Sequence, residues 1–241
     1  MQEWFHIKHH CTTQRQIAAG AAKNHTHAAM NPKAQYRFEM SVDDVLADRE
    51  ITYPLTRSMC APIGDGAAAA IVCSESALKT LPAEVRERAI LIRGQGLSGG
   101  KYRGLEEDGL SRFAAERAYK MAGLTPQDVD VAEVHDATSF CEIYQVEMMG
   151  FCEKGKGGSF VESGETTLGG KLPVNTSGGL VSKGHPVGAT GLSMTNELVQ
   201  QLRGEAGDRQ VEGAHVALAE NGGGVVVFDE AACSVLLMSR S

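Results

Sequence analysis

Three residues in glycine-rich or turn-like stretches could move protons. The first, His185, lies in the glycine-rich run from Asn175 to Gly191. Glycine lets backbone N–H groups approach a ligand closely, and Pro186 restricts the backbone of the residue before it. A predicted helix over 190–203 follows, and its N-terminus favours an anion or a developing oxyanion. His185 is therefore a candidate acid–base or oxyanion-binding group; the alternative is an ordinary turn residue.

The second candidate, His135, is followed by Asp136 directly after a predicted strand over 129–134. A neutral imidazole offers one hydrogen-bond donor and one acceptor, so His135 could bind or protonate a substrate oxygen. In the simpler alternative, Asp136 or Thr138 caps the next helix and His135 is a surface turn residue.

The third candidate, Glu220, begins the run Glu220-Asn221-Gly222-Gly223-Gly224 after a predicted strand over 214–219. By itself this run is a turn with mobile glycines, but a carboxylate beside two imidazoles could serve as a general base. Loops at the carboxyl ends of strands meet at one edge of an α/β sheet, so the three candidates are expected to converge. Together they indicate acyl or carbonyl chemistry, in which an oxyanion needs preorganised donors.

The elements that must position these residues alternate between strand and helix from residue 89 onward, which predicts an α/β layered domain. A polar connector near residues 81–87 divides the chain into predicted domains 1–86 and 87–241. The predicted helices span 13–23, 74–80, 109–122, 139–149 and 190–203, and the predicted strands span 67–73, 89–96, 129–134, 172–175, 214–219, 224–228 and 235–238.

Composition excludes several classes of protein. The 241 residues are 42% hydrophobic and 22% charged, as in ordinary globular proteins, and the net charge of −7 argues against a general nucleic-acid binder. No apolar run reaches the roughly 18 to 20 residues of a membrane span. The six cysteines have no metal-type spacing, so no metal is expected. Several, such as Cys73 and Cys233, lie in apolar runs and are predicted to be buried free thiols, which with no signal peptide indicates a cytoplasmic setting.

Taken together, these motifs resemble the C-terminal half of a thiolase. The most specific motif is Gly-His-Pro-Val-Gly-Ala-Thr-Gly, and the His-Asp pair resembles that of the sterol-carrier-protein-type thiolases, where ordinary thiolases carry Asn-Glu. The matching stretches, which extend the likeness over essentially the whole chain, are Lys23-Asn24-His25, Asn31-Pro32, Asp65 to Ala69, His135-Asp136 and Gly184 to Gly191.

The resemblance implies an α/β fold of two similar βαβαβαββ domains. This chain would hold the second domain complete, a mixed sheet with helices on both faces, and only the tail of the first. His185 would activate the nucleophile and bind the thioester oxygen, His135 would hold a water or the substrate oxygen, and Glu220 would be a proton shuttle. The expected oxyanion or substrate loops contain Asp136, Asn175, Gly184, Asn221, Gly222 and Gly223.

The sequence departs from the family pattern at two points. The nucleophilic cysteine of the family lies in the first half, ahead of anything present here, and we interpret Cys60 as structural. Ordinary thiolases also place an acid–base cysteine where this chain has Glu220. A carboxylate with an ordinary pKa near 4.3 is a weaker base than a thiolate, unless burial raises the carboxyl pKa.

The function implied by the resemblance is thiolytic cleavage or Claisen-type formation of a 3-oxoacyl-CoA, with coenzyme A or acyl-CoA as substrate and no permanently bound cofactor. A bulky aromatic or steroid acyl group, a homo-oligomer and a small OB-fold, zinc-ribbon partner protein are further implications. Two alternatives stay open. Some thiolase-like proteins that lack the second cysteine are retro-aldolases acting on a β-hydroxyacyl-CoA, and without the nucleophilic half the chain could be a non-catalytic acyl-CoA-binding or assembly module.

Overall fold

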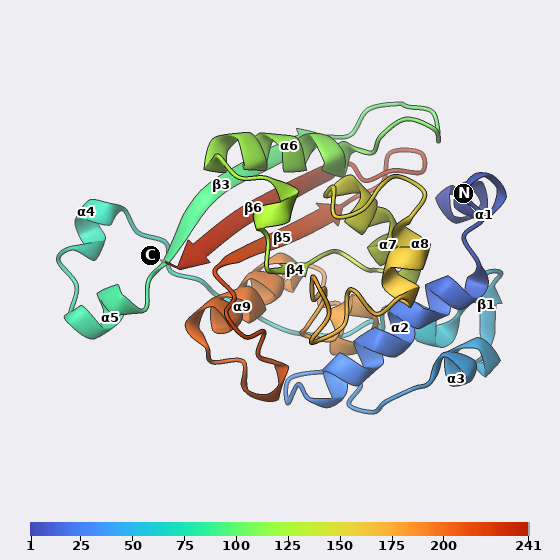
Figure 1. Ribbon diagram of the computed structural model, residues 1–241, viewed down its shortest axis with the longest axis horizontal. Coiled ribbons are helices and arrows are strands. Elements are labelled where there is room, and N and C mark those ends of the chain that lie inside the picture. The colour runs from blue at the N-terminus through green and yellow to red at the C-terminus, as the bar shows by residue number, and fades with distance from the viewer. Residues whose placement is uncertain (241) are drawn as a thin grey trace.

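A four-stranded mixed sheet forms the centre of the molecule, with helices on both faces (Figure 1). This computed structural model describes residues 1–240. The strand order is β3-β6-β5-β4; β6 runs antiparallel to both β3 and β5, whereas β4 and β5 are parallel. The strands span β3 Ile90–Gly99, β4 Val131–Glu133, β5 Val216–Gly223 and β6 Ala232–Arg240. The expected α/β class, a mixed sheet with helices on both faces, is confirmed.

Helix α6 (Leu110–Ala122) covers one face of the sheet through small residues. Ala114 and Ala118 are fully buried there, and β3 meets the helix through two glycines. A Cβ atom at Gly96 would lie 1.9 Å from the carbonyl oxygen of Ala114, so only glycine permits this approach. The helix ends at Gly123 in the left-handed conformation, as its sequence predicts.

Helix α9 (Thr190–Arg203) covers the opposite face. Leu198 and Leu202 lie one helical turn apart, are fully buried and pack with Ala217, Ala219 and Met238. The apolar periodicity of this segment is therefore satisfied by the sheet, and the predicted helix over 190–203 is confirmed.

The first part of the chain packs on the side of the sheet where α7 (Ser139–Met148) and α8 (Gly157–Glu162) lie (Figure 1). Its main helix, α2, begins with a capping box at Thr13 and runs beyond the predicted end at residue 23. The remaining helices and strands are α1 Gln2–His10, α2 Gln14–Ala29, α3 Val42–Ala47, β1 Glu50–Thr52, β2 Leu55–Thr56, α4 Glu75–Leu78 and α5 Ala83–Glu87. Short 3-10 turns span Arg57–Met59, Pro126–Asp128 and Gly207–Arg209, and a π-helical turn spans Gly179–Lys183.

Three predicted strands differ in the structure. Residues 67–73 are extended but belong to no strand; Ile71 is 99% exposed and Cys73 is exposed too, so the prediction of a buried strand is wrong. A continuous apolar run forms a strand only beside a hydrogen-bonding neighbour, and within residues 1–240 this segment has none. Residues 172–175 contribute one bridge, Ala132 to Val174, and 224–228 form a loop.

The first four residues of the run 220–224 are not a turn, because β5 continues through Gly223. Its pairing with β6 places Glu220 opposite Val235 and Gly222 opposite Cys233. Cys233 is a buried free thiol, as predicted.

Helices α4 and α5 form an exposed arm at the left of Figure 1, where the predicted domain boundary at residue 86 falls. Among the described residues no helix is both long and apolar enough to cross a membrane.

Candidate active site

The parallel pairing of β4 with β5 brings the predicted site residues together. Glu133 of β4 lies opposite Ala219 of β5, so His135 and Glu220 follow at the same edge of the sheet. The ring of His185 reaches this edge from the loop before α9. Its centroid lies 5.0 Å from that of His135, with the rings nearly perpendicular at 82°. The predicted convergence of the three loops is therefore present in the structure.

A hydroxyl group orients the ring of His185. The Nδ1 atom of His185 lies 2.8 Å from the Oγ1 atom of Thr190, which donates its own proton to the carbonyl oxygen of Pro186 at 3.2 Å. When the Thr190 hydroxyl group donates to Pro186, its oxygen accepts from His185 Nδ1–H, because a hydroxyl group has one proton. In this tautomer the Nε2 atom of neutral His185 keeps its lone pair and can accept a proton.

Glu220 is fully buried between the two loops. Its Oε2 atom accepts the backbone N–H of His135 at 2.9 Å, and its Oε1 atom accepts the thiol of Cys233 at 3.1 Å. Burial raises the pKa of Glu220 to about 7, which brings it into the range of a useful general base.

The imidazoles of His135 and His185 are both neutral near pH 7. Burial, followed by repulsion from a charged His185, lowers the pKa of His135 to about 4. Burial also lowers the pKa of His185, and the nearby ammonium group of Lys183 adds to the effect. The site therefore combines two neutral imidazoles with a carboxyl group that changes its charge near pH 7.

Asp136 and Asn175 are fully buried and hold the loops in place. Asp136 accepts the amide of Asn24 at 2.8 Å and the backbone N–H of Leu180 at 2.6 Å. Asn175, at a positive φ of 55°, accepts the backbone N–H of Val134 at 2.8 Å. These bonds position the two histidine-bearing turns, and direct contact of Asp136 or Asn175 with substrate stays a prediction.

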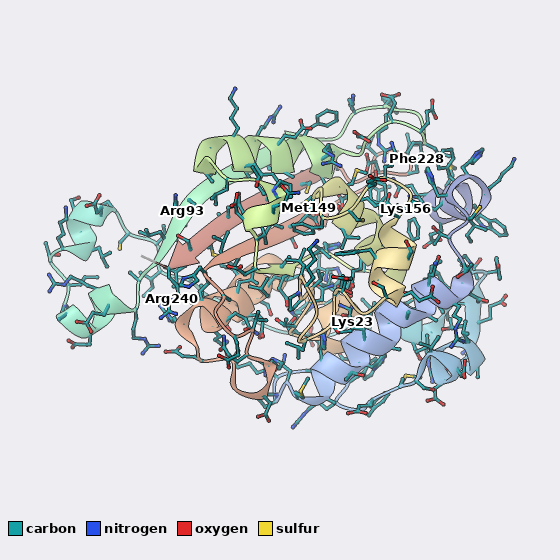
Figure 2. The ribbon with its side chains drawn as sticks, in the orientation of Figure 1. Lys23, Arg93, Met149, Lys156, Phe228 and Arg240 are labelled. Atoms are coloured by element: carbon teal, nitrogen blue, oxygen red, sulfur yellow. The ribbon has the colours of Figure 1, made fainter. Side chains whose placement is uncertain are left out.

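The same interior contains a buried ion pair. The ammonium group of Lys23 lies 2.9 Å from Glu142 Oε1 and donates to the carbonyl oxygen of Val174 at 2.5 Å. Lys23 lies among the crowded side chains where α2 meets the rest of the molecule (Figure 2). Lys23 thereby connects α2 to α7 and to Val174, which lies just before the glycine-rich loop that contains His185.

The remaining predicted loop residues divide by position. Asn221 lies against the start of α9, because a Cβ atom at Gly191 would come within 3.3 Å of its side chain. Gly184 has a φ of 111°, which favours glycine, and lies beside Gln35. Gly222 faces the carboxyl group of Glu230, whereas Gly223 is exposed and borders open space.

The sequence reasoning missed Thr190, Cys233 and Glu230 as members of the site. Thr190 could have been found, since it lies five residues after His185 in the same motif and starts the helix. Glu230 has no such signal, because Phe228-Asp229-Glu230 is typical of a surface turn. In the structure Gln145 Nε2 donates to Glu230 Oε1 at 3.1 Å, and burial followed by the charge of Glu220 raises the pKa of Glu230 to about 9.

Residues 109–237 match the family model described as Thiolase C-terminal domain-like. The chain belongs to the thiolase family. It is 42% identical to Sterol carrier protein 2 of Homo sapiens, covering 95% of this chain and 45% of that protein. It is 41% identical to the acetyl-CoA acetyltransferase of Methanothermobacter thermautotrophicus, covering 91% of this chain and 57% of that one. The resemblance to the sterol-carrier-protein-type thiolases is confirmed.

Other relatives agree with this membership. The benzoylsuccinyl-CoA thiolase subunit BbsB of Thauera aromatica is 36% identical, with 83% of this chain and 52% of that one covered. The solved Ltp2-ChsH2(DUF35) aldolase superposes over 100% of this chain and 62% of that one, with a TM-score of 0.84 and 23% identity, which shows a shared fold. The chain spans about half the length of the curated relatives it matches.

Four of the six cysteines in this thiolase-family chain have raised, not lowered, thiol pKa values. Burial is the main cause that raises the pKa of the thiols of Cys60, Cys141, Cys152 and Cys233. Cys60 is half-buried, and its residue bridges to Thr138, next to the turn after β4. This agrees with the interpretation of Cys60 as structural, since a nucleophilic thiol needs a lowered pKa.

The one group among residues 1–240 with the spacing of a metal site is Glu220, Glu230 and Cys233, whose ligand atoms lie within 4.8 Å of one another. The chemistry of the thiol argues against a cation there. A thiol must lose its proton to bind a metal, and Cys233 instead donates that proton to Glu220 while burial raises its pKa.

Proposed function

We propose that this chain is the C-terminal part of an enzyme that breaks or forms a carbon–carbon bond in the acyl chain of a coenzyme A thioester. The observation that carries the proposal is the meeting of His185, His135 and Glu220 at one edge of the sheet, with both imidazoles neutral and the carboxyl group near its pKa. A reaction that creates an enolate needs an oxygen-binding donor and a base, and these residues supply both.

The leading candidate reaction is thiolysis of a 3-oxoacyl-CoA, or its reverse, a Claisen condensation. In it, His185 Nε2 takes the proton of a nucleophilic thiol and donates to the thioester oxygen, His135 binds the second oxygen, and Glu220 carries the proton to and from the enolate carbon. Relatives at about 40% identity named acetyl-CoA acetyltransferase and thiolase support this reaction. The nucleophilic cysteine would come from outside this chain.

Retro-aldol cleavage of a β-hydroxyacyl-CoA is the second candidate, and the state of Glu220 favours it. A buried carboxyl group with a pKa of about 7 can remove the proton of a hydroxyl group, and this reaction needs no covalent acyl-enzyme. None of the four cysteines with a shifted pKa is activated, which is consistent with a reaction that uses no thiolate. The fold neighbour with the TM-score of 0.84 is also named an aldolase.

A partner protein belongs to the proposal. The solved aldolase combines Ltp2 with ChsH2(DUF35), and we propose that this chain likewise works with a small partner, in line with the OB-fold, zinc-ribbon partner that the resemblance implies. A homo-oligomer and a bulky aromatic or steroid acyl group are proposed on the family likeness.

Product analysis separates the candidates. The chain, with the rest of its protein and its partner, is incubated with a 3-oxoacyl-CoA plus coenzyme A and, separately, with a β-hydroxyacyl-CoA. Thiolysis yields two acyl-CoA products, whereas retro-aldol cleavage yields one acyl-CoA and a free aldehyde or ketone. Binding of both thioesters without any product would reject an enzymatic role and leave the acyl-CoA-binding module.

A further inference from the structure

Glu230 lies where it can act on the proposed base. It belongs to the loop 224–231 between β5 and β6, and its carboxyl group rests directly on the backbone of Gly222. A Cβ atom at Gly222 would lie 2.1 Å from that carboxyl group, so the contact depends on glycine. The side chains of Glu220, Glu230 and Cys233 each place one oxygen or sulfur atom within 4.8 Å of the others.

The cation nearest this loop is directed at a different carboxyl group. The guanidinium group of Arg103 lies 2.5 Å from Asp229 Oδ2, donates to the hydroxyl oxygen of Tyr144 at 3.0 Å and stacks 5.0 Å from the ring of Phe228. Figure 2 shows Phe228 in this loop. Asp229 therefore takes the ion pair, and the side chain that donates to Glu230 is the neutral amide of Gln145.

Apart from Arg103, whose positive charge lowers the pKa of Glu230, the groups around the two carboxyl groups are neutral or negative. The titratable and charged groups facing Glu220 and Glu230 come from the turn after β4, from α7, from β6 and from the two neighbouring loops: His135, Cys141, Tyr144, Cys233, Arg103 and Asp229. Glu220 is fully buried and Glu230 partly buried, so two carboxylates at this separation repel each other and ionisation of one opposes ionisation of the other.

We propose that Glu220 and Glu230 form a carboxyl pair that holds one proton, with Glu230 as the positioning residue that keeps this proton beside Glu220. Burial raises the pKa of both groups, and the charge of Glu220 raises that of Glu230 further, which agrees with the proposal. The thiol of Cys233, which donates to Glu220 and lies within 4.8 Å of Glu230, borders both carboxyl groups.

The use of the Glu220–Glu230 pair in the reaction rests on the proposed function. In retro-aldol cleavage, ionised Glu220 accepts the proton of the substrate hydroxyl group, so the pair then holds two protons. The carbon–carbon bond breaks, its electron pair stays on the enolate, and the enolate carbon takes one proton from the pair. The pair ends with one proton, as it began.

Infrared titration tests whether Glu220 and Glu230 share one proton, and it needs no turnover. The C=O stretch of a protonated carboxyl group is followed against pH in the whole protein, in Glu220→Gln and in Glu230→Gln, and difference spectra assign each group. We expect Glu230 in Glu220→Gln to ionise roughly one pH unit or more lower than in the wild type, because the neighbouring charge is gone. The control Glu116→Gln, on the exposed side of α6, leaves both ionisations unchanged. An unshifted Glu230 would overturn the proposal.

The pH profile of the activity tests the catalytic use. The wild type should lose kcat/KM at high pH as Glu230 gives up its proton. In Glu230→Gln this high-pH decline should disappear, and kcat should fall about tenfold, since a lost proton donor weakens acid–base catalysis. A folded Glu230→Gln variant with the wild-type profile would reject the role in catalysis. If that variant does not fold, the Glu220→Gln titration still decides the sharing, and absence of all turnover would reject the proposed function alone.

Discussion

The carboxylate of Glu220 accepts the backbone N–H of His135 at 2.9 Å, joining β5 to the turn after β4. This bond fixes the distance between a base with a pKa of about 7 and an imidazole that stays neutral. His185, 5.0 Å from His135 between ring centroids, completes the group. The chemistry of the site therefore depends on a backbone contact that any residue except proline at position 135 would keep, so the two side chains can be altered separately.

Replacing Glu220 with glutamine should lower kcat at least a hundredfold, because general acid–base groups contribute on the order of 10² to 10⁴ in rate. The amide oxygen still accepts the His135 N–H, so coenzyme A binding should stay within about twofold in a calorimetric titration. Glu116→Gln, an exposed substitution of the same kind, controls for the change itself. Near-normal turnover by Glu220→Gln would remove this residue from the mechanism.

Replacing Thr190 with valine removes the acceptor of His185 Nδ1–H while keeping the shape of the side chain. One orienting hydrogen bond is worth on the order of 1 kcal/mol, so kcat should fall about fivefold with little change in KM. Thr195→Val is the matched control, since its hydroxyl group donates to the carbonyl oxygen of Gly191 in the same helix without touching the histidine. Equal kinetics for the two variants would contradict the orienting role.

Replacing Gly222 with alanine should displace the carboxyl group of Glu230, because the new Cβ atom would lie 2.1 Å from it. Because the displaced atoms are the end of a flexible side chain, the cost should be at the lower end of the range for overpacking, about 1 kcal/mol of unfolding free energy. Gly223→Ala, on the exposed neighbour with no atom within 4 Å of its Cβ position, should change the unfolding free energy by less than about 0.5 kcal/mol. Urea unfolding of both variants measures the difference, and equal stability would show that Glu230 does not rest on Gly222.

The stability of the fold should fall with acid through His27. This ring lies between the carbonyl oxygen of Asn175 and the backbone N–H of Leu168, so its neutral form fits and burial lowers its pKa to about 3. Since the unfolded chain takes up this proton near pH 6.5, the stabilisation is complete above that pH and is lost as the pH falls toward 3.

The acid dependence is measured by urea unfolding at pH values from 7 to 5. His27→Gln should be less stable at pH 7 by about 1 to 3 kcal/mol, because one buried hydrogen bond is lost, and its stability should fall less steeply with acid. His9→Gln, on the exposed side of α1, should keep the wild-type slope. An unchanged slope in His27→Gln would assign the acid sensitivity to other groups.

Local signals were enough to predict the three central residues. His135 and Glu220 follow strand patterns and His185 lies in a motif that restricts its backbone, so the sheet edge could be inferred from the order of elements. The sequence also predicts Asp136 and Asn175 as residues of the substrate loops. In the structure their side chains accept hydrogen bonds from backbone N–H groups of the protein. Loops that follow parallel strands meet at one edge, which makes such a site predictable.

Long-range contacts explain what could not be predicted. Glu230 is partly buried because Gly222 leaves room for it and because Arg103 pairs with Asp229, and no local pattern contains either contact. Residues 67–73 have the composition of a strand, but a strand also needs a neighbour. The glycines after Glu220 were expected to form a turn, whereas pairing with β6 extends β5 through them.

The most direct test of the account is the structure of the protein bound to an unreactive acyl-CoA analogue. The account predicts that the thioester oxygen lies within hydrogen-bond distance of His185 Nε2, with the rest of the acyl chain directed toward Glu220. An analogue whose thioester group lies away from both histidines would contradict it.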